Sequence, residues 1–266
     1  MTKIDSIDFF NNKKRNLMLE ICPDKKLEGK IWSEMLTAIK HFSLIEKGDR
    51  VIVAVSGGKD SLTMLHFLHL FKKRNILDFD FVAVHVVTDV SLEKEDYKPR
   101  DVENIFKEMG ITYEIPAVDL SNPKYNKKGY TDCYWCATQK RRLMFAAAEK
   151  HKCNKIAFGH HKDDVVITNF MNAFYLSNLQ TMRVSQKFFD GKYHIIRPLC
   201  LLREKQILRY AQLMQIPATC NCCRVARDGR REQVTEILHN LEKQIPEIVE
   251  SCFWAFAKND EKLSSC

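Results

Sequence analysis

The chain has 266 residues, 45% of them hydrophobic, which suffices for one large α/β domain with extensions. No apolar run approaches the roughly 20 residues that cross a bilayer, and residues 1–14 lack the apolar core of a signal peptide. We therefore expect a cytoplasmic protein with no membrane partner. The net charge of +8 weakly favours a polyanionic partner.

The first part of the chain alternates predicted helices and strands. An amphipathic helix is indicated by apolar residues at every fourth position: Leu27, Ile31, Met35 and Ile39. Strands are predicted at residues 51–55, 81–87 and 111–115, and the first is a continuous apolar run typical of strands buried on both faces. Helices are expected after residue 61 and at residues 100–109.

The second part continues the alternation and then becomes helical. A polar loop at residues 122–129 leads to a CxxC motif, a helix at 137–150, a fourth strand at 155–158 and a helix ending near residue 175. Asp190-Gly191 between two strand-like segments indicates a hairpin. Further helices are expected at residues 204–214, 231–241 and 246–256.

This order predicts an α/β fold with a doubly wound parallel sheet, helices on both its faces and a helical extension at each end. We expect an N-terminal extension over residues 1–46 and a nucleotide-binding domain with the CxxC over residues 47–218. Residues 219–266 then form a C-terminal extension with a second cysteine cluster and a basic helix.

A glycine-rich segment between the first strand and the next helix is suited to binding a pyrophosphate. Backbone amides at a helix N-terminus attract anions, and paired glycines let a ligand approach the backbone. The candidate nucleotide-binding residues are Ser56, Gly57, Gly58, Lys59, Asp60 and Ser61. The segment has neither Walker A nor GxGxxG spacing, which disfavours kinases, GTPases and Rossmann dehydrogenases. The alternative is a glycine turn with a capping serine.

A second polar segment, residues 159–164, follows the fourth strand. Loops at the carboxyl ends of strands line the ligand crevice of a doubly wound sheet. Asp163 and Asp164 there are suited to Mg²⁺ carried with phosphates, and His160 has a supporting role. Alternatively, the two carboxylates only stabilise the first turn of a helix.

The ten cysteines are unusual for a cytosolic chain, where they are more often metal ligands than disulfides. Cys133 and Cys136 form the CxxC, and Cys220, Cys222 and Cys223 lie close together further on. Two such clusters indicate a metal site. Zinc bound by four cysteines is one alternative, because Cys220 and Cys223 form a second CxxC.

Basic residues adjoin both cysteine clusters, which favours a nucleic acid partner over solvated helix faces alone. They are Lys140, Arg141, Arg142, Arg224, Arg227, Arg230 and Arg231.

The sequence SGGKDS after a hydrophobic strand closely resembles the pyrophosphatase-loop (PP-loop) motif of N-type ATP pyrophosphatases. Members of that family adenylate a carbonyl oxygen, release pyrophosphate and let a nucleophile displace AMP. The resemblance implies an adenine nucleotide alpha-hydrolase-like fold, ATP as substrate with Mg²⁺, and catalytic roles for Lys59 and Asp60.

Motifs along nearly the whole chain, about residues 27–258, resemble the tRNA 2-thiocytidine synthetase family in order and spacing. They are the CYWC motif, GHHKDD, IRPL, REK and CNCC. The resemblance implies a [4Fe–4S] cluster bound by Cys133, Cys136 and Cys223, with one iron left to bind the sulfur that is transferred. Cys222 or Cys220 is an alternative third ligand.

This resemblance predicts an ATP-dependent tRNA sulfurtransferase that adenylates the C2 carbonyl of a cytidine in the anticodon loop and replaces its oxygen with sulfur. The expected partners are tRNA, a cysteine desulfurase or other sulfur donor, and an electron donor for the cluster, with a possible homodimer. The alternatives are a thiolase acting on another base or a small-molecule carbonyl, and a zinc-containing RNA-binding module without catalysis.

Overall fold

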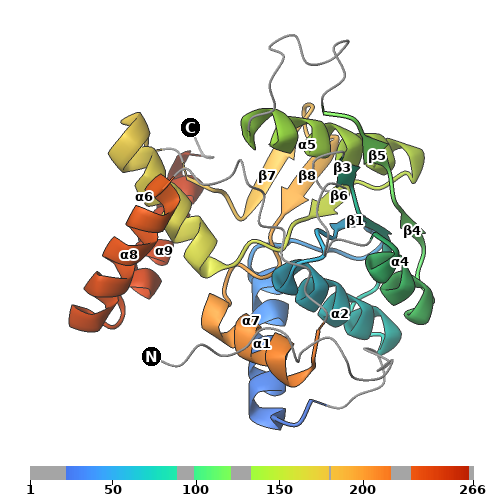
Figure 1. Ribbon diagram of the computed structural model, residues 1–266, viewed down its shortest axis with the longest axis horizontal. Coiled ribbons are helices and arrows are strands. Elements are labelled where there is room, and N and C mark those ends of the chain that lie inside the picture. Colours follow the sequence, from blue (N-terminus) through green and yellow to red (C-terminus); the bar gives the residue numbers. More distant parts are fainter. Residues whose placement is uncertain (1–21, 89–98, 121–132, 180, 217–228, 264–266) are drawn as a thin grey trace.

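A central sheet brings the polar loops of the chain to one edge. The computed structural model describes residues 22–88, 99–120, 133–179, 181–216 and 229–263 (Figure 1). Neighbouring strands are parallel except β7 and β8. From edge to edge the strands are β4 (Tyr113–Glu114), β2 (Asp80–Val84), β1 (Arg50–Ala54), β6 (Lys155–Ala157), β8 (Tyr193–Ile196) and β7 (Ser185–Phe188). A separate parallel pair consists of β3 (Val87–Thr88) and β5 (Ala117–Val118).

Helices connect these strands and extend the chain at both ends. The first begins where the carboxylate of Asp24 accepts a hydrogen bond from the Leu27 amide at 2.9 Å, which satisfies a free helix N–H group. The helices are α1 (Lys25–His41), α2 (Lys59–Lys73), α4 (Pro99–Glu108), α5 (Cys133–Lys150), α6 (Lys162–Leu176), α7 (Glu204–Leu213), α8 (Gly229–Gln244) and α9 (Ile248–Leu263).

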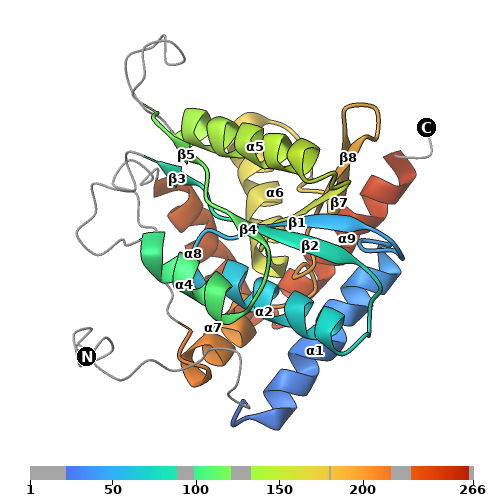
Figure 2. The same cartoon turned by 90° about the vertical axis from the view of Figure 1, so that its right-hand side faces the viewer.

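The two faces of the sheet bury separate apolar clusters because successive residues of β1 point to opposite faces. On one face, Met144 and Ala148 of α5 pack in a cluster with Ile52. On the other face, Val51 and Val53 belong to a larger core with side chains of α1, α2, α4 and α7. Figure 2 shows α5 on one side of the sheet and α1, α2 and α7 on the other. The predicted α/β fold, a mostly parallel sheet between helices, is confirmed.

The strand order places a crevice between β1 and β6. From β1 the chain proceeds to β2 and β4 on one side, and then crosses to β6 and β8 on the other. The loops after β1 and β6 therefore diverge at the carboxyl edge of the sheet, which is where ligands bind in open α/β folds. Both polar segments that the sequence singles out, residues 56–61 and 159–164, lie at this edge.

The remaining sequence predictions hold to different degrees. The hairpin is confirmed: Asp190 and Gly191 have φ of +54° and +87°, and the Lys192 amide donates to the Phe189 carbonyl at 3.0 Å. The predicted strand 111–115 is only two residues long, and the last helix is longer than predicted. The division of the chain at residues 46 and 218 stays a prediction.

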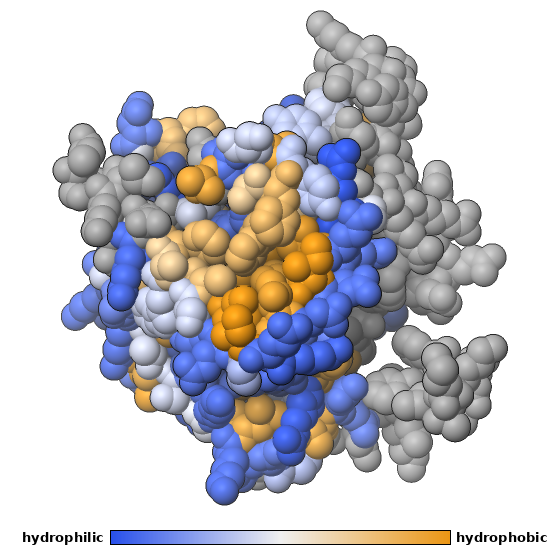
Figure 3. All heavy atoms as spheres, turned by 90° about the vertical axis from the view of Figure 1, so that its left-hand side faces the viewer, coloured by the Kyte–Doolittle hydropathy of each residue, from blue (hydrophilic) through white to orange (hydrophobic). Residues whose placement is uncertain are grey.

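The side of α6, α8 and α9 carries exposed apolar surface (Figure 3). Large side chains at the end of α6 and in the loop after it are exposed: Phe174, Tyr175, Leu176 and Leu179. Clustered exposed apolar side chains are typical of surfaces that contact other macromolecules. No described helix is long and apolar enough to cross a membrane.

Gly159 provides the first testable prediction. A Cβ atom there would lie 3.0 Å from the Ser61 amide nitrogen and 3.2 Å from the Asp60 carbonyl carbon, both backbone atoms that cannot move aside easily. We expect Gly159→Ala to separate the two loops, to destabilise the protein by about 1–3 kcal/mol and to weaken ATP binding. Chemical denaturation and nucleotide titration measure both effects.

Gly29→Ala is the matched control, because a Cβ at Gly29 meets no atom within 4 Å and alanine favours the helix that contains it. Nucleotide binding by Gly159→Ala that equals the Gly29→Ala control would contradict this packing role.

Candidate active site

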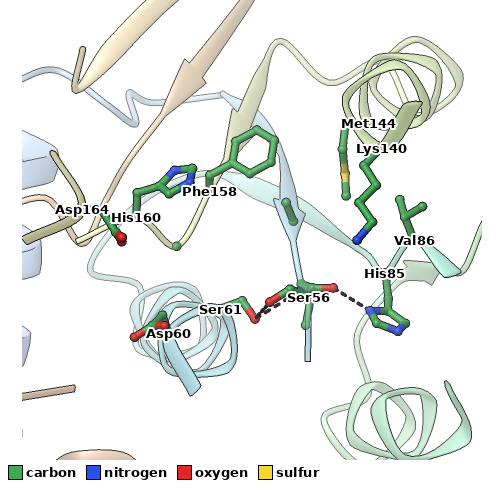
Figure 4. Close-up of a pocket in the computed structure, with 13 residues that line it drawn as sticks. Ser56, Asp60, Ser61, His85, Val86, Lys140, Met144, Phe158, His160 and Asp164 are labelled. Atoms are coloured by element: carbon green, nitrogen blue, oxygen red, sulfur yellow. Dashed lines mark hydrogen bonds between the residues drawn. The ribbon is translucent and has the colours of Figure 1, made fainter. Parts of the chain in front are cut away.

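A cavity of about 280 Å³ lies at the carboxyl edge of the sheet, beneath α5 (Figure 4). Its lining comes from the end of β1 and the following loop with the start of α2, from the residues directly after β2, from the loop after β6 with the start of α6, and from α5. The polar lining residues are Ser56, Asp60, Ser61, His85, Lys140, His160 and Asp164. Four segments far apart in the sequence thus meet at one cavity.

The loop after β1 is closed by its own serine hydroxyls. The Ser61 hydroxyl accepts a hydrogen bond from the Ser56 amide at 3.1 Å and donates to the Gly58 carbonyl at 3.0 Å. Gly57 has φ of +86°, a backbone conformation that residues with a side chain rarely adopt. Gly58 precedes α2 and has no side chain to cap it, so the first amides of α2 keep their capacity to bind an anion.

Asp60 and His160 each present a buried polar atom without a hydrogen-bond partner. These atoms are Oδ1 of Asp60 and Nδ1 of His160. Burial raises the pKa of Asp60 against the attraction of Lys59 and His161. Burial also lowers the pKa of His160 to about 4, so this imidazole is neutral at pH 7. An unpaired carboxylate oxygen beside an anion-binding helix end fits a Mg²⁺ ion carried with phosphates.

Asp164 lines the same cavity and already has partners. Its carboxylate accepts a hydrogen bond from the His161 amide at 3.1 Å, and Nδ1 of His161 accepts one from the Asp164 amide at 3.3 Å, which caps α6. Arg231 of α8 forms an ion pair with the other carboxylate oxygen. Burial acts to raise the pKa of Asp164, but attraction by His161 and Arg231 outweighs it and lowers the pKa.

Two of the predicted site residues lie beside the cavity rather than in its lining. Lys59 forms ion pairs with Glu204 at 2.9 Å and Asp60 at 3.2 Å. Asp163 accepts hydrogen bonds from Nε of Arg203 at 2.9 Å and from the Glu204 amide at 2.7 Å. Both side chains therefore join their helices to the start of α7, and their roles in nucleotide binding stay predictions.

Sequence reasoning did not assign His85, Phe158 or Met144 to the site, and it assigned Lys140 to a nucleic acid surface. His85 directly follows β2, and its Nδ1 lies 2.7 Å from the Val55 carbonyl. Its position near the carboxyl end of the strand predicted at residues 81–87 was an available signal. Lys140 follows Cys136 by four residues on α5, so spacing alone could have placed them on one side of that helix.

The CxxC lies in the first turn of α5. Cys133 begins this helix, and Cys136 in its first turn is half-buried. Positions three apart lie on one side of a helix, and a helix N-terminus favours the thiolate form that binds metal. These two residues therefore fit a thiolate-bound metal site. Cys220, Cys222 and Cys223 lie outside the described residues, and the described part contains no group of three potential metal ligands.

The basic residues have different surroundings. Lys140 lines the cavity, Arg231 pairs with Asp164, and the Arg230 guanidinium lies over the Tyr175 ring at 5.3 Å. Arg141 and Arg142 are exposed on α5. Arg224 and Arg227 lie outside the described residues.

Comparison with known proteins identifies the class first. A family model described as a PP-loop domain matches residues 30–236, which include the whole cavity. The tRNA-cytidine(32) 2-sulfurtransferase of Delftia acidovorans is 36% identical over 234 residues, covering 86% of this chain and 73% of the relative. That of Geobacter metallireducens is 34% identical over 239 residues, covering 88% and 91%. The chain belongs to this family of PP-loop sulfurtransferases, as its motifs predict.

A solved structure supports the fold. The U34-tRNA thiolase NcsA from Methanococcus maripaludis, determined with its [4Fe–4S] cluster, superposes with a TM-score of 0.73 at 22% identity. The match covers 90% of this chain and 80% of that one. The predicted PP-loop architecture is thereby confirmed.

Neutralising Asp60 and neutralising Asp164 should change the Tm in opposite directions. The pKa of Asp60 is raised from its ordinary 3.8, so its charge opposes folding at pH 7, and Asp60→Asn should raise the Tm of the nucleotide-free protein by about 1–4 °C. The pKa of Asp164 is lowered from 3.8, so its charge stabilises the fold above that pH, and Asp164→Asn should lower the Tm.

Thermal unfolding at pH 7 measures both effects. The contribution of Asp164 should disappear as the pH falls below 3.8, whereas lowering the pH should relieve the cost of Asp60. Both variants should lose the rise in Tm that MgATP gives the wild type. Equal Tm changes for the two variants would contradict the electrostatic analysis.

Proposed function

We propose that this protein replaces O2 of cytidine 32 in tRNA with sulfur in an ATP-dependent reaction. The observation that carries the proposal is the shared cavity of the PP-loop and α5. The cavity places the start of α2 opposite Lys140, and Lys140 lies one turn after the CxxC on the same helix. Family membership supplies the acceptor, since the relatives are named for cytidine 32 of tRNA.

The reaction has two displacement steps. First, O2 of the cytosine attacks the α-phosphorus of ATP, an O–P bond forms, and pyrophosphate leaves. Second, sulfide adds to C2, the C2–O2 bond breaks, and AMP leaves with that oxygen. Each step places negative charge on phosphate oxygens, which positive groups near the leaving group stabilise.

The cavity residues bind and neutralise these phosphates. The amides at the start of α2 are the donors at the position where the PP-loop closes, and the hydroxyls of Ser56 and Ser61, 3.1 Å apart, hold the loop in this conformation. Lys140 contributes a cation from the opposite side of the cavity (Figure 4). Asp60 and Asp164 would hold Mg²⁺, which neutralises the pyrophosphate. No side chain is needed as a general base, because O2 of cytosine carries no proton.

The CxxC would provide the site at which sulfur is held for the second step. Cys133 and Cys136 would hold a [4Fe–4S] cluster together with Cys223, or with Cys222 or Cys220 in its stead. When bound, this cluster supplies an iron that carries the sulfide. A cysteine desulfurase or another donor would provide the sulfur, and an electron donor would maintain the cluster. Because Cys136 and Lys140 lie one turn apart, sulfur and phosphate would meet along one side of α5.

The tRNA would bind over α5 and the basic segment before α8. Arg141 is exposed on α5, where it would contact phosphates of the anticodon stem-loop. Cytoplasmic localisation follows from a tRNA substrate. A homodimer, if formed, would use the exposed apolar side chains at the end of α6.

The central test is a comparison of thionucleosides in tRNA from cells with and without this gene. We expect 2-thiocytidine to disappear on deletion and to return with the wild-type gene. Lys59→Ala and Asp60→Ala should fail to restore it, because both alter the PP-loop. Lys192→Ala should restore it, since this exposed lysine pairs with Glu149 away from the cavity. Persistence of 2-thiocytidine in the deletion strain would refute the proposal.

The cysteine assignment predicts a separate set of results. Cys133→Ala, Cys136→Ala and Cys223→Ala should each lose the iron and sulfide content and the visible absorption of the anaerobic protein. Cys153→Ala and Cys200→Ala should keep them, because these thiols are buried in the apolar cores. Full iron content in Cys223→Ala would move the third ligand to Cys222 or Cys220, and a colourless protein with zinc would contradict the cluster.

A further inference from the structure

The REK motif at the start of α7 is a feature that the proposed function leaves without a role. Its glutamate, Glu204, is the first residue of α7, and its carboxylate lies 2.9 Å from Nζ of Lys59. Lys59 is the first residue of α2 and supplies the positive side chain of the PP-loop motif. The REK motif and the PP-loop, 145 positions apart in the sequence, therefore meet in one ion pair.

The position of Glu204 is fixed by groups other than its own carboxylate. Its backbone amide donates a hydrogen bond to Oδ2 of Asp163 at 2.7 Å. The preceding residue, Arg203, donates from Nε to Oδ1 of the same carboxylate at 2.9 Å, and its two other nitrogens bind Glu242 at 3.0 Å each. The start of α7 is thus attached to α6 and α8, and a change in the Glu204 carboxylate leaves these attachments in place.

Packing also holds α7 against α2, the helix that begins with Lys59. The two helices lie side by side (Figures 1 and 2). The Tyr210 hydroxyl of α7 lies 3.0 Å from Nδ1 of His66 in α2, and both residues are buried. Gln206 of α7 donates to Glu34 of α1 at 2.8 Å. Packing and these hydrogen bonds therefore keep the two helix starts close to each other, whether or not Lys59 and Glu204 are paired.

The Lys59 ammonium lies between residues of two different cavities. Asp60, 3.2 Å from Nζ, lines the active-site cavity at the carboxyl edge of the sheet. Glu204 lines a second cavity of about 400 Å³ between α6, α7, α8 and α9. The Lys59 side chain itself is 23% exposed and the Glu204 side chain 51%. A small movement of a flexible side chain therefore decides which cavity the ammonium serves.

The charges around Lys59 favour an exchange of partners when phosphates bind. Burial acts to lower the pKa of Lys59, but attraction by Glu204 and Asp60 outweighs it and raises the pKa. Lysine suits such an exchange, because its ammonium is a compact charge with rotatable donors on a flexible stem. A phosphate group with two negative charges attracts this ammonium more strongly than the single charge of Glu204 does. Phosphates beside Asp60 would therefore take Lys59 from Glu204.

We propose that Glu204 is a positioning residue that acts through Lys59. It holds the ammonium while the cavity is empty, yields it to the phosphates of ATP, and takes it back when pyrophosphate leaves. This assignment rests on the proposed function, which supplies ATP and pyrophosphate as ligands. Because phosphates must displace a carboxylate to reach Lys59, Glu204 weakens pyrophosphate binding and favours its release after the first step.

The test is a double-mutant cycle on the binding of pyrophosphate with Mg²⁺, measured by calorimetry. The four proteins are wild type, Glu204→Gln, Lys59→Ala and the double variant. Glutamine keeps the shape of the glutamate side chain without its charge, and the backbone contact with Asp163 is retained. Glu236→Gln is the matched control, because it removes the same charge from an exposed glutamate of α8 that lines neither cavity.

We expect Glu204→Gln to lower the Kd of pyrophosphate by about 3- to 10-fold, as for removal of a competing, partly exposed ion pair. In the Lys59→Ala background the same change should alter the Kd by less than about twofold, and so should Glu236→Gln in the wild-type background. Pyrophosphate should inhibit tRNA thiolation by Glu204→Gln at correspondingly lower concentrations. The Tm without ligand should change little, since the attachments of α7 remain.

Three results would overturn the assignment. Weaker pyrophosphate binding in Glu204→Gln would make Glu204 a fixed support that directs Lys59 toward the phosphates. Equal tightening with and without Lys59 would indicate simple repulsion between Glu204 and the ligand, and an unchanged Kd would leave Glu204 with no influence on it.

The cycle also separates this assignment from the proposed function. A wild type that binds pyrophosphate but thiolates no tRNA would refute the proposed function, and the cycle would still decide the role of Glu204. A wild type that binds neither ATP nor pyrophosphate would overturn both.

Discussion

The apolar contact between α5 and the sheet places the cysteine motif and the nucleotide cavity on one rigid element. Met144 carries this contact, since it is 6% exposed, packs in the cluster with Ile52 and also lines the cavity. Lys140 lies one turn before Met144, and Cys136 lies one turn before Lys140. The distance between the CxxC and Lys140 is therefore set by helix geometry, about 6 Å for each step of four residues. Repacking beneath Met144 would displace both together.

Charges around the cavity are organised in ion pairs that hold the surrounding helices. Lys59 of α2 pairs with Glu204 at the start of α7, and Arg203 binds Asp163 of α6 and Glu242 of α8. The bidentate contact of Arg203 with Glu242, at 3.0 Å for both nitrogens, is the geometry in which such pairs are strongest. The residues at the start of α7, Arg203 and Glu204, therefore join three other helices beside the PP-loop.

Sequence patterns predicted the fold and the PP-loop because both depend on local signals. The apolar run of β1 and the glycines before Lys59 define a strand, a turn and a helix within a few residues. Lys140 and Arg231 were assigned to a nucleic acid surface because charge runs carry no information on tertiary partners. The place of Lys140 in the cavity lining and that of Arg231 beside Asp164 depend on how α5 and α8 dock, which only the packed structure defines.

The ion pair between Arg231 and Asp164 connects the cavity with the C-terminal part of the chain. Arg231 lies in the first turn of α8, and the preceding residues 217–228 contain Cys220, Cys222 and Cys223. A cation that takes Asp164 as a ligand must compete with Arg231 for the same carboxylate. The two effects are thermodynamically reciprocal. The free energy by which the Arg231 ion pair weakens binding of the cation equals the free energy by which the bound cation weakens the ion pair that attaches α8. Cation binding in the cavity is therefore thermodynamically coupled to the attachment of α8, the helix that follows the second cysteine cluster.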